Sequence, residues 1–592
     1  MKHPRETLPQ QTGDFPPATE EEWLEKARAS LRGGDPLALT EHSEDGIAIP
    51  PVLAGARPLP MPARPGPVSK RHGWAIMQRL DDPDLERAAA QAQAELDGGS
   101  DGLVLVLEDA PTAGGFGLPV DGFMAILEGL EAELFPLQLD SGPHWPGAAS
   151  RLLAHYTARR YDLSRAPLLL NAAPFADPDG PEPSARQMAA LLKTGPAAGV
   201  FCADTRLFHA LGASAAQEIA LAAAAMVEML RLLEAQGVAA EKAAARLTWL
   251  LAADAAHFST IAKLRAARLV HHRILDAAGL PITPLLLQAE SAWRMLSRRD
   301  AHVNMLRAAS ATLGAGLGGA DAVTVLPFTA ALGLADPFAR RMARNAQIIA
   351  LEEAGLDKVA DPAAGSAFIE YLTAELARKG WEIFRRIEQA GGMASALASG
   401  MVREMLAEMA ERRAVEAATL ARPITGVSAY PAKEDSPPDV LAPIADDASL
   451  PPRLAAPFEA LAEAADEWER AHGHRPQVAL VTLDDETGAA RGRREWAANL
   501  LAAGGIAART MGLEDFHGRH AVAILCAGDA TLAERGAQAI TQLKEKGARQ
   551  VWIAGKPEVM AQLLAAGAEG AAHAGMDALA FLRRLHEILG VS

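Results

Sequence analysis

The chain has 592 residues, which is too long for one hydrophobic core and indicates about two to four domains. Its formal net charge of −17 argues against a general nucleic-acid surface, because such a surface needs a basic face. The two cysteines, Cys202 and Cys526, lie far apart within apolar runs, which argues against a disulfide framework and against a cysteine-based zinc site. There is no apolar leader and no run of the ~18 apolar residues that span a membrane, so we expect a protein of the reducing cytoplasm.

Residues 1–70 are expected to form an N-terminal arm. Residues 1–20 are polar and contain proline, which is typical of a segment without a core of its own. A short amphipathic helix is predicted within residues 21–33. Its shared apolar face consists of Trp23, Leu24, Ala27 and Leu31. Residues 43–70 are rich in Pro and Gly and are expected to be extended, either as a solvent loop or as a grip on a partner chain.

Residues 71–420 show a regular alternation of short apolar runs and longer helical patterns. Each apolar run suits a strand that is buried on both faces, as in a parallel sheet. The eight runs are residues 73–78, 102–108, 135–140, 167–172, 199–204, 247–254, 283–290 and 322–328. Eight strands alternating with helices predict a (β/α)8 TIM barrel, and the long helical segments that follow are expected to pack outside it.

Residues 421–472 are predicted to be a linker, because Pro, Asp and Ser are dense there before a helix begins. A second α/β pattern occupies residues 473–592, where five short apolar runs alternate with helical segments. This pattern predicts a flavodoxin-like, doubly wound domain.

Three strings carry a resemblance to a known family: HFSTIAKLRAARLV (257–270), FARRMARNAQIIALEEAG (338–355) and VADPAAGSAFIEYLT (359–373). EQAGGMASAL and RPITGVSAYP follow them in the same order. The chain resembles the cobalamin-dependent acyl-CoA mutases along nearly its whole length, and methylmalonyl-CoA mutase in particular. The resemblance implies a barrel followed by a cobalamin-binding domain that is flavodoxin-like.

The second domain departs from the family where cobalamin is held. The family has a DxHxxG motif in which the His coordinates cobalt from below and the Asp orients that His. In this chain Ala489 stands at the His position, Thr487 at the Asp position, and Leu483 where the family has a Lys. An alanine methyl has no lone pair and cannot coordinate cobalt. We therefore expect no cobalamin on this domain.

The slot for the nucleotide tail of cobalamin is also altered. Cys526 and Ala527 stand in the family's SxL segment, and Ala554 replaces one glycine of its GG segment. Lys556 follows directly. These changes narrow the slot or place a charge in it.

The barrel lacks the catalytic Tyr-His pair that the resemblance implies. Arg206 stands at the Tyr position and Leu207 at the His position, whereas His209 lies two residues further on and is expected to be an ordinary loop or helix-start residue. The family's tyrosine-bearing segment near the start of the barrel is also missing, because no Tyr precedes Tyr156.

The pattern is that of the small (beta) subunit of a heterodimeric methylmalonyl-CoA mutase, which resembles a large subunit that has lost its active site. We therefore expect no catalytic, cofactor-binding or metal-binding residue in this chain, with adenosylcobalamin on a catalytic large subunit that converts methylmalonyl-CoA to succinyl-CoA. One alternative is a self-sufficient cobalamin-dependent acyl-CoA mutase. Another is a non-enzymatic acyl-CoA-binding or cobalamin-binding module. Neither nucleic acid nor a membrane is expected as a partner.

Several other features have simpler interpretations. Lys263, Arg265 and Arg268 share one predicted helix, where a solvated face or intersubunit ion pairs are favoured over CoA phosphates. Glu290, Arg294 and Arg298 have helical spacing and are expected to pair with one another. The glycine-rich segment 314–321 predicts a tight turn, Ser366 a helix N-cap, and His271 and His272 side chains that point apart.

Overall fold

The computed structural model describes residues 19–53, 58–66, 68, 73–163, 167–172, 174–176, 180–194, 199–432, 436–445, 450–483, 488–555 and 562–591. Eight parallel strands close into a barrel in the order β10-β3-β4-β5-β6-β7-β8-β9. Their bounds are β3 Ala75–Leu80, β4 Gly102–Val106, β5 Leu137–Asp140, β6 Leu168–Ala172, β7 Gly199–Asp204, β8 Leu247–Ala253, β9 Leu286–Ser291 and β10 Ala322–Thr324. Each predicted apolar run overlaps one of these strands, so the predicted eight-stranded barrel is confirmed.

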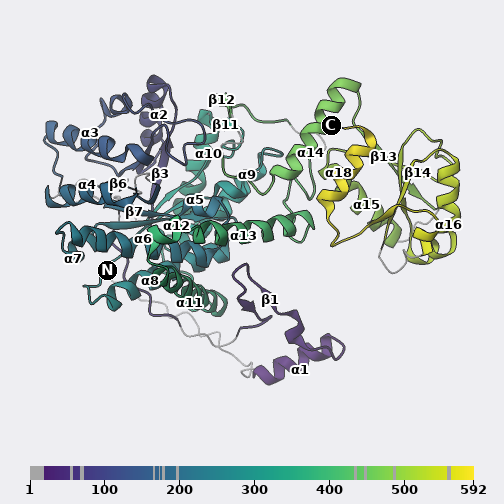
Figure 1. Cartoon of the computed structure of the whole chain (residues 1–592), viewed down its shortest axis with the longest axis horizontal. Helices are drawn as coiled ribbons and strands as arrows, with labels where there is room; N and C mark the ends of the chain where they lie inside the picture. Colours follow the sequence, from purple (N-terminus) through teal and green to yellow (C-terminus); the bar gives the residue numbers. More distant parts are fainter. Residues whose placement is uncertain are drawn as a thin grey trace, which may run out of the picture.

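Helices surround the barrel. Those between the strands and directly after β10 are α2 Leu85–Asp97, α3 Trp145–Ala158, α4 Pro181–Thr194, α5 Arg206–Ala210, α6 Ala215–Ala235, α7 Ala240–Ala244, α8 His257–Ala277, α9 Val303–Leu317 and α10 Pro337–Ile348. Three more follow, α11 Ala367–Gln389, α12 Met393–Ala398 and α13 Met401–Ala418. The long α11 packs along α6 and α8, outside the ring, as predicted for these segments (Figure 1).

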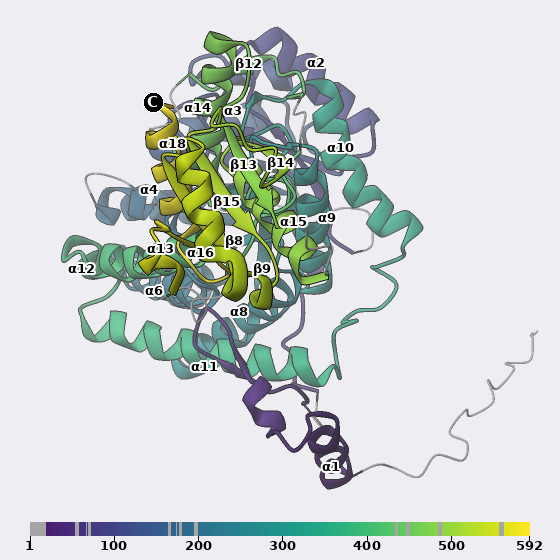
Figure 2. The same ribbon diagram turned by 90° about the vertical axis from the view of Figure 1, so that its right-hand side faces the viewer.

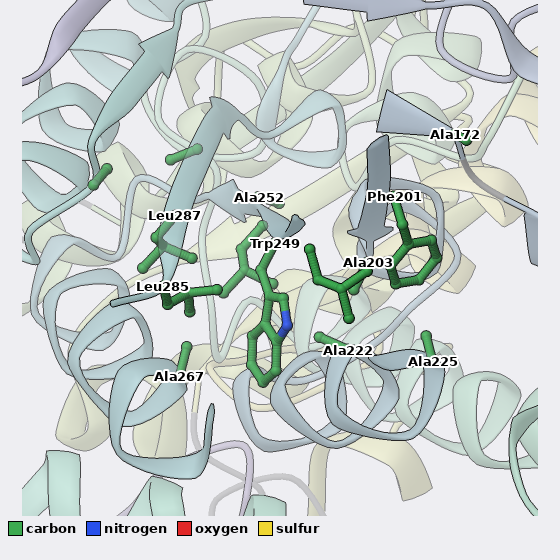
Figure 3. Close-up of a cluster of buried hydrophobic side chains, with 14 of the residues drawn as sticks. Ala172, Phe201, Ala203, Ala222, Ala225, Trp249, Ala252, Ala267, Leu285 and Leu287 are labelled. Carbon is green, nitrogen blue, oxygen red and sulfur yellow. The ribbon is translucent and has the colours of Figure 1, made fainter. Parts of the chain in front are cut away.

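The main core lies between the strands and the surrounding helices. Figure 3 shows the indole of Trp249 extending from β8 among small and branched side chains, with Ala267 of α8 and Ala222 of α6 on either side of it. Alanines on the helix faces let the ring lie close to the helix backbones, and Trp249 has no exposed surface. Small helix residues facing large strand residues give the dense packing that protein interiors require.

The glycines of segment 314–321 serve close packing as well as a turn. Gly316 lies within α9, and a Cβ there would be 2.3 Å from Trp74 Cζ3. Gly319 has a φ of +84° and reverses the chain before β10, so the predicted turn occupies only the end of the segment. Ser366 caps α11 by accepting a hydrogen bond from Ile369 N, as predicted.

The C-terminal part of the chain contains a five-stranded parallel sheet with the order β14-β13-β15-β16-β17. Its strands are β13 Gln477–Thr482, β14 Ala507–Gly512, β15 Val522–Cys526, β16 Gln550–Ala554 and β17 Gly570–Ala572. The helices nearby are α14 Ala456–His472, α15 Gly488–Ala503, α16 Asp529–Glu545 and α18 Ala578–Leu589. Separate apolar clusters cover the two faces of the sheet. Figure 2 views this part from its outer side, with α16 in front of the sheet.

The N-terminal arm begins with helix α1 Glu20–Ser30, which carries a capping box and extends away from the barrel (Figures 1 and 2). No residue of α1 is buried. A short hairpin of β1 Glu41–His42 and β2 Ala48–Ile49 follows. It is anchored to the barrel through Glu44, which forms an ion pair with Arg413 at 2.6 Å. The small remaining pair is β11 Gly333–Leu334 with β12 Ala442–Pro443.

No helix in the described ranges is both long and apolar enough to cross a membrane.

Candidate functional site

The carboxyl ends of the barrel strands, called the mouth here, carry a network of ion pairs. Arg206 begins α5 directly after β7 and is 7 % exposed. Its guanidinium donates to Asp140 Oδ2 at 2.9 Å, to Asp204 Oδ2 at 2.6 Å and to Glu290 Oε2 at 3.0 Å. Burial disfavours the charged guanidinium, but the three surrounding carboxylates raise the pKa of Arg206 well above its usual value. The side chain is therefore held as a cation by strands β5, β7 and β9.

A second arginine extends the same network. Arg79 at the end of β3 donates to Asp81 Oδ2 at 3.0 Å and lies 3.5 Å from Glu290 Oε2. Asp81 also pairs with Arg340 of α10 at 2.8 Å. Burial raises the pKa of Asp81, but the two guanidinium groups outweigh it and lower that pKa to about 2. The charged groups of the mouth thus neutralise one another across the barrel.

His209 belongs to a neighbouring buried cluster. Its Nδ1 lies 2.8 Å from Glu218 Oε1, and its Nε2 lies 3.3 Å from Asp254 Oδ2. Lys263 of α8 donates to the same Glu218 oxygen at 2.5 Å. Burial raises the pKa of Glu218, but Lys263 and His209 lower it to about 2. His209 lies in the short helix α5, which agrees with the helix-start alternative, but it is buried among Glu218, Asp254 and Lys263 and is not a loop residue.

The basic residues of α8 are also placed differently from the prediction. Lys263, Arg265 and Arg268 are all buried and pair within the chain, so they are neither a solvated face nor available for intersubunit ion pairs. Arg265 pairs with Glu370 at 2.8 Å, and Arg268 with Asp321 at 2.8 Å. The barrel needs these cations because the carboxylates that they neutralise are themselves buried.

The predicted pairing among Glu290, Arg294 and Arg298 is wrong. β9 continues to Ser291, so Glu290 points into the mouth while the other two residues lie beyond the strand. Arg294 pairs with Asp254 at 3.3 Å, and Arg298 lies 3.5 Å from Glu463 of α14. The three residues have helical spacing, but they do not share one helix, because Glu290 lies in β9. The adjacent histidines of α8 do differ as predicted, because His271 is buried and His272 is partly exposed.

Arg206 and Leu207 separate two cavities at the mouth. One cavity of about 80 Å³ has Arg79, Glu290 and Trp293 among its lining residues. The other, about 120 Å³, lies toward β6 and α6 and includes Asn171 and Cys202 in its lining. Burial raises the pKa of the Cys202 thiol, so this group stays protonated and unreactive. Arg206 and Leu207, at the positions where the resemblance implies a Tyr-His pair, thus form a partition between the two cavities.

The barrel axis is crossed by polar side chains below these cavities. Asn171 of β6 donates to Gln288 Oε1 of β9 at 3.0 Å, and Gln288 donates to Thr248 Oγ1 of β8 at 3.1 Å. β6 and β9 are not neighbours in the barrel, so the Asn171–Gln288 hydrogen bond spans its interior. An extended ligand along the axis would have to displace this cross-link.

The second domain does not fit cobalamin held by a histidine below the metal. Ala489 lies in the first turn of α15 and is exposed, while Leu483 is buried at the end of β13. Arg493 of α15 reaches across the carboxyl edge of the sheet and donates to Ala527 O at 2.6 Å. The guanidinium thus ties α15 to the loop after β15. No group at these positions offers a lone pair to cobalt.

Only some of the other positions of the expected slot for the nucleotide tail lie within the described residues. Cys526, Ala527 and Ala554 are buried at the ends of β15 and β16, whereas Thr487 and Lys556 lie outside the described residues. Tyr156 lies in α3, where its hydroxyl donates to Ala132 O at 2.6 Å. Its role is packing. In the described ranges no three His, Cys, Asp or Glu side chains gather in a way that could hold a metal ion.

Comparison with known proteins identifies the family. A sequence profile of the family described as methylmalonyl-CoA mutase matches residues 197–467. The methylmalonyl-CoA mutase small subunit of Streptomyces virginiae is 36 % identical over 98 % of both chains. That of Propionibacterium freudenreichii subsp. shermanii is 32 % identical over 71 % of this chain and 69 % of its own. A methylmalonyl-CoA mutase of Cereibacter sphaeroides is 29 % identical over 71 % of this chain and 65 % of its own. The chain belongs to the methylmalonyl-CoA mutase family.

Proposed function

We propose that this chain is the structural, non-catalytic small subunit of a heterodimeric methylmalonyl-CoA mutase. The family is cobalamin-dependent, and several relatives are named as small subunits, a term that implies a larger partner. In this proposal the large subunit holds adenosylcobalamin and converts methylmalonyl-CoA to succinyl-CoA, while this chain stabilises it. We place the complex in the cytoplasm.

The ion network around Arg206 carries the proposal. A catalytic chain of this family has a Tyr-His pair at the positions that Arg206 and Leu207 occupy here. The Arg206 guanidinium is committed to Asp140, Asp204 and Glu290 within 3.0 Å. Leu207 carries no proton donor or acceptor on its side chain. This chain therefore offers no catalytic residue at these positions.

We propose the following division of the chain into domains. Residues 1–70 form the arm, 71–420 the acyl-CoA mutase-like barrel with its additional helices, 421–472 the linker, and 473–592 a degenerate cobalamin-type domain. The strand order β14-β13-β15-β16-β17 is 2-1-3-4-5 in chain order, which supports a flavodoxin-like assignment for the last domain. The order reverses between β13 and β15, which is where such domains bind ligands. Arg493 bridges that edge here.

The arm is the proposed contact with the large subunit. No residue of α1 is buried within the described part of the chain, and Leu37 and Leu39 next to it are 58 % and 55 % exposed. The adjoining hairpin is fixed to the barrel through Glu44, so the arm starts from a rigid base. A projecting apolar segment of this kind needs a partner surface to cover it.

The test is co-expression with the large subunit, followed by cobalamin content and turnover of the complex and of each chain. We expect one cobalamin per heterodimer and no turnover by this chain alone. A matched pair of variants sharpens the assignment. Ala489→Glu is tolerated at an exposed position and should leave cobalamin content and turnover unchanged, whereas replacing the motif His of the large subunit should abolish both. Loss of cobalamin in the Ala489→Glu complex, or turnover by this chain alone, would refute the proposal.

A further inference from the structure

Helix α9 presents an apolar stripe on the outside of the barrel. The stripe recurs at every third or fourth residue and consists of Val303, Leu306, Ala309, Leu313 and Leu317. Leu306 is 71 % exposed, Ala309 is exposed, and the other three are partly buried. Arg307 is the one charged residue of the helix, and its guanidinium is engaged within the chain by Asn304 Oδ1 at 2.6 Å and by Thr425 O at 2.7 Å. A barrel helix normally turns a polar face to water, so this stripe needs an explanation.

Aromatic side chains extend the stripe at the start of α9. His302 lies against Phe328 with the ring centroids 5.3 Å apart, and Phe328 meets Phe338 of α10 edge-on at 6.2 Å. Phe338 is itself about half exposed. In Figure 2, α9 and α10 lie on the right-hand side of the barrel, above the arm.

The other end of the stripe leads to the N-terminal arm. Leu317 and Phe368 of α11 pack around the same small buried cluster, and Phe368 meets the half-exposed Phe258 of α8 edge-on at 5.6 Å. Phe368 also lines an open groove of about 440 Å³, whose other apolar walls are arm residues, among them Leu39 and Leu53. The stripe of α9, with Phe338, Phe258 and Phe368, is called the α9 face here. It is continuous with the arm through this groove.

The apolar character of the α9 face is not general on the outside of the barrel. On α11 the side chains of Glu375, Arg378 and Glu382 are charged and pair along the helix. The α9 face and the arm together have large apolar side chains that are about half exposed or more: Leu306, Phe258, Phe338, Leu37, Leu39 and Val52. At about 100 Å² for each of them, they present on the order of 600 Å². That is the upper end for a patch on a monomer and approaches the ~800 Å² that each partner contributes to a stable interface.

We propose that the α9 face is covered by the large subunit, as a second contact beside the arm. The inference rests on the proposed function, because it takes the larger partner that the names of the relatives imply as the occupant. Continuity with the arm favours this occupant, since a partner that contacts the arm at the groove also reaches Phe368 and the end of α9. The uncharged stripe fits the apolar centre of a lasting subunit interface, which is poor in charged residues.

The experiment measures the dissociation constant of the co-expressed heterodimer by sedimentation over a dilution series. Leu306→Glu and Ala309→Glu each place a carboxylate on the stripe at an exposed position. Leu134→Glu is the matched control, because Leu134 is 61 % exposed but precedes β5, away from β9 and β10 in the barrel order. We expect the first two variants to weaken the heterodimer about tenfold or more, because a carboxylate covered by an apolar surface loses its water. The control should stay within about twofold, and all three isolated chains should keep the wild-type melting temperature.

The outcomes separate this inference from the proposed function. If the wild type binds the large subunit and the α9 variants bind it as tightly as the control, the α9 face is not the interface, and the proposed function stands. If the wild type does not bind the large subunit, both are wrong. Self-association of the wild-type chain that Leu306→Glu abolishes, with the heterodimer unaffected, would assign the face to a second copy and overturn the proposal. Should Leu306→Glu lower the melting temperature, Ala309→Glu decides, because it removes no apolar side chain larger than a methyl group.

Discussion

The stability of the barrel should fall between pH 7.5 and pH 5 because of one buried histidine. His271 of α8 is 3 % exposed, and its ring meets Trp249 edge-on with the ring centroids 6.0 Å apart. Burial first, and then the charges of Arg268 and His272, lower the pKa of His271 from 6.5 to about 4. The folded chain therefore keeps this ring neutral in a range where the unfolded chain protonates it.

The sign and size follow from linkage. Between pH 6.5 and pH 4 the unfolded state binds more protons than the folded state, so the free energy of unfolding decreases as the pH falls. At pH 5 the pKa difference of His271 shifts the folding equilibrium toward the unfolded state by a factor of about 30, which corresponds to about 2 kcal/mol. At pH 7.5 the same expression gives about 0.1 kcal/mol or less. The change between these two pH values is therefore about 2 kcal/mol.

The assay compares wild type with His271→Leu, which places an apolar side chain of similar size in an apolar site. The urea midpoint of the barrel transition is measured for both at pH 7.5 and pH 5 and converted with the slope of the transition. Titrations shared by the two proteins cancel in the difference. We expect the wild type to lose about 2 kcal/mol more than the variant. Equal losses would show that His271 does not take up a proton on unfolding and would refute the reasoning.

Three further changes test other parts of the fold. Lys263→Met leaves the fully buried Glu218 carboxylate without its nearest cation and should lower the stability of the barrel by about 3–5 kcal/mol. The control Lys242→Met, at an exposed site, should change the stability by no more than about 0.5 kcal/mol. Urea denaturation measures both. Gly316→Ala places a methyl group against the indole ring of Trp74 and should lower the stability by about 1–3 kcal/mol. Gly147→Ala, with nothing within 4 Å of the added methyl, should raise the stability by about 0.5–1 kcal/mol. Equal melting temperatures of the two variants would contradict the close approach of Gly316 to Trp74. Trp23→Ala should leave the stability of the isolated chain within about 0.5 kcal/mol and weaken binding of the large subunit in a titration, because no residue of α1 is buried within the described part of this chain.

Local patterns in the sequence predicted most of the fold. Strands buried on both faces are continuous apolar runs, so the eight barrel strands and the five later strands could be located from residue type alone. The ends were less accurate. The last barrel run was predicted to reach residue 328, but β10 ends at Thr324, because apolar residues also fill the loop that closes the cavity above it. Apolar character reports burial and not backbone conformation.

The site was harder to predict because its partners are distant in the sequence. The positions of Arg206 and Leu207 could be found by resemblance, but Asp140 and Glu290 are 66 and 84 residues from Arg206, and no local pattern relates them. The same holds for Arg265, whose partner Glu370 is 105 residues away. A charged residue on an amphipathic helix looks solvated until the opposing surface is known. Closing the barrel is what brings these charges together.

The ion network at the mouth also constrains how this chain can change over generations. Arg206 is the shared cation of Asp140, Asp204 and Glu290. Replacing it by tyrosine would remove an ion-pair partner from all three carboxylates. Arg79 would then be the cation of the mouth that still approaches Glu290. A substitution at this one position is destabilising, because uncompensated buried charges cost several kcal/mol. Under the proposed non-catalytic role, a return to catalysis would require several substitutions together. The salt bridges of the mouth therefore disfavour any single replacement of Arg206.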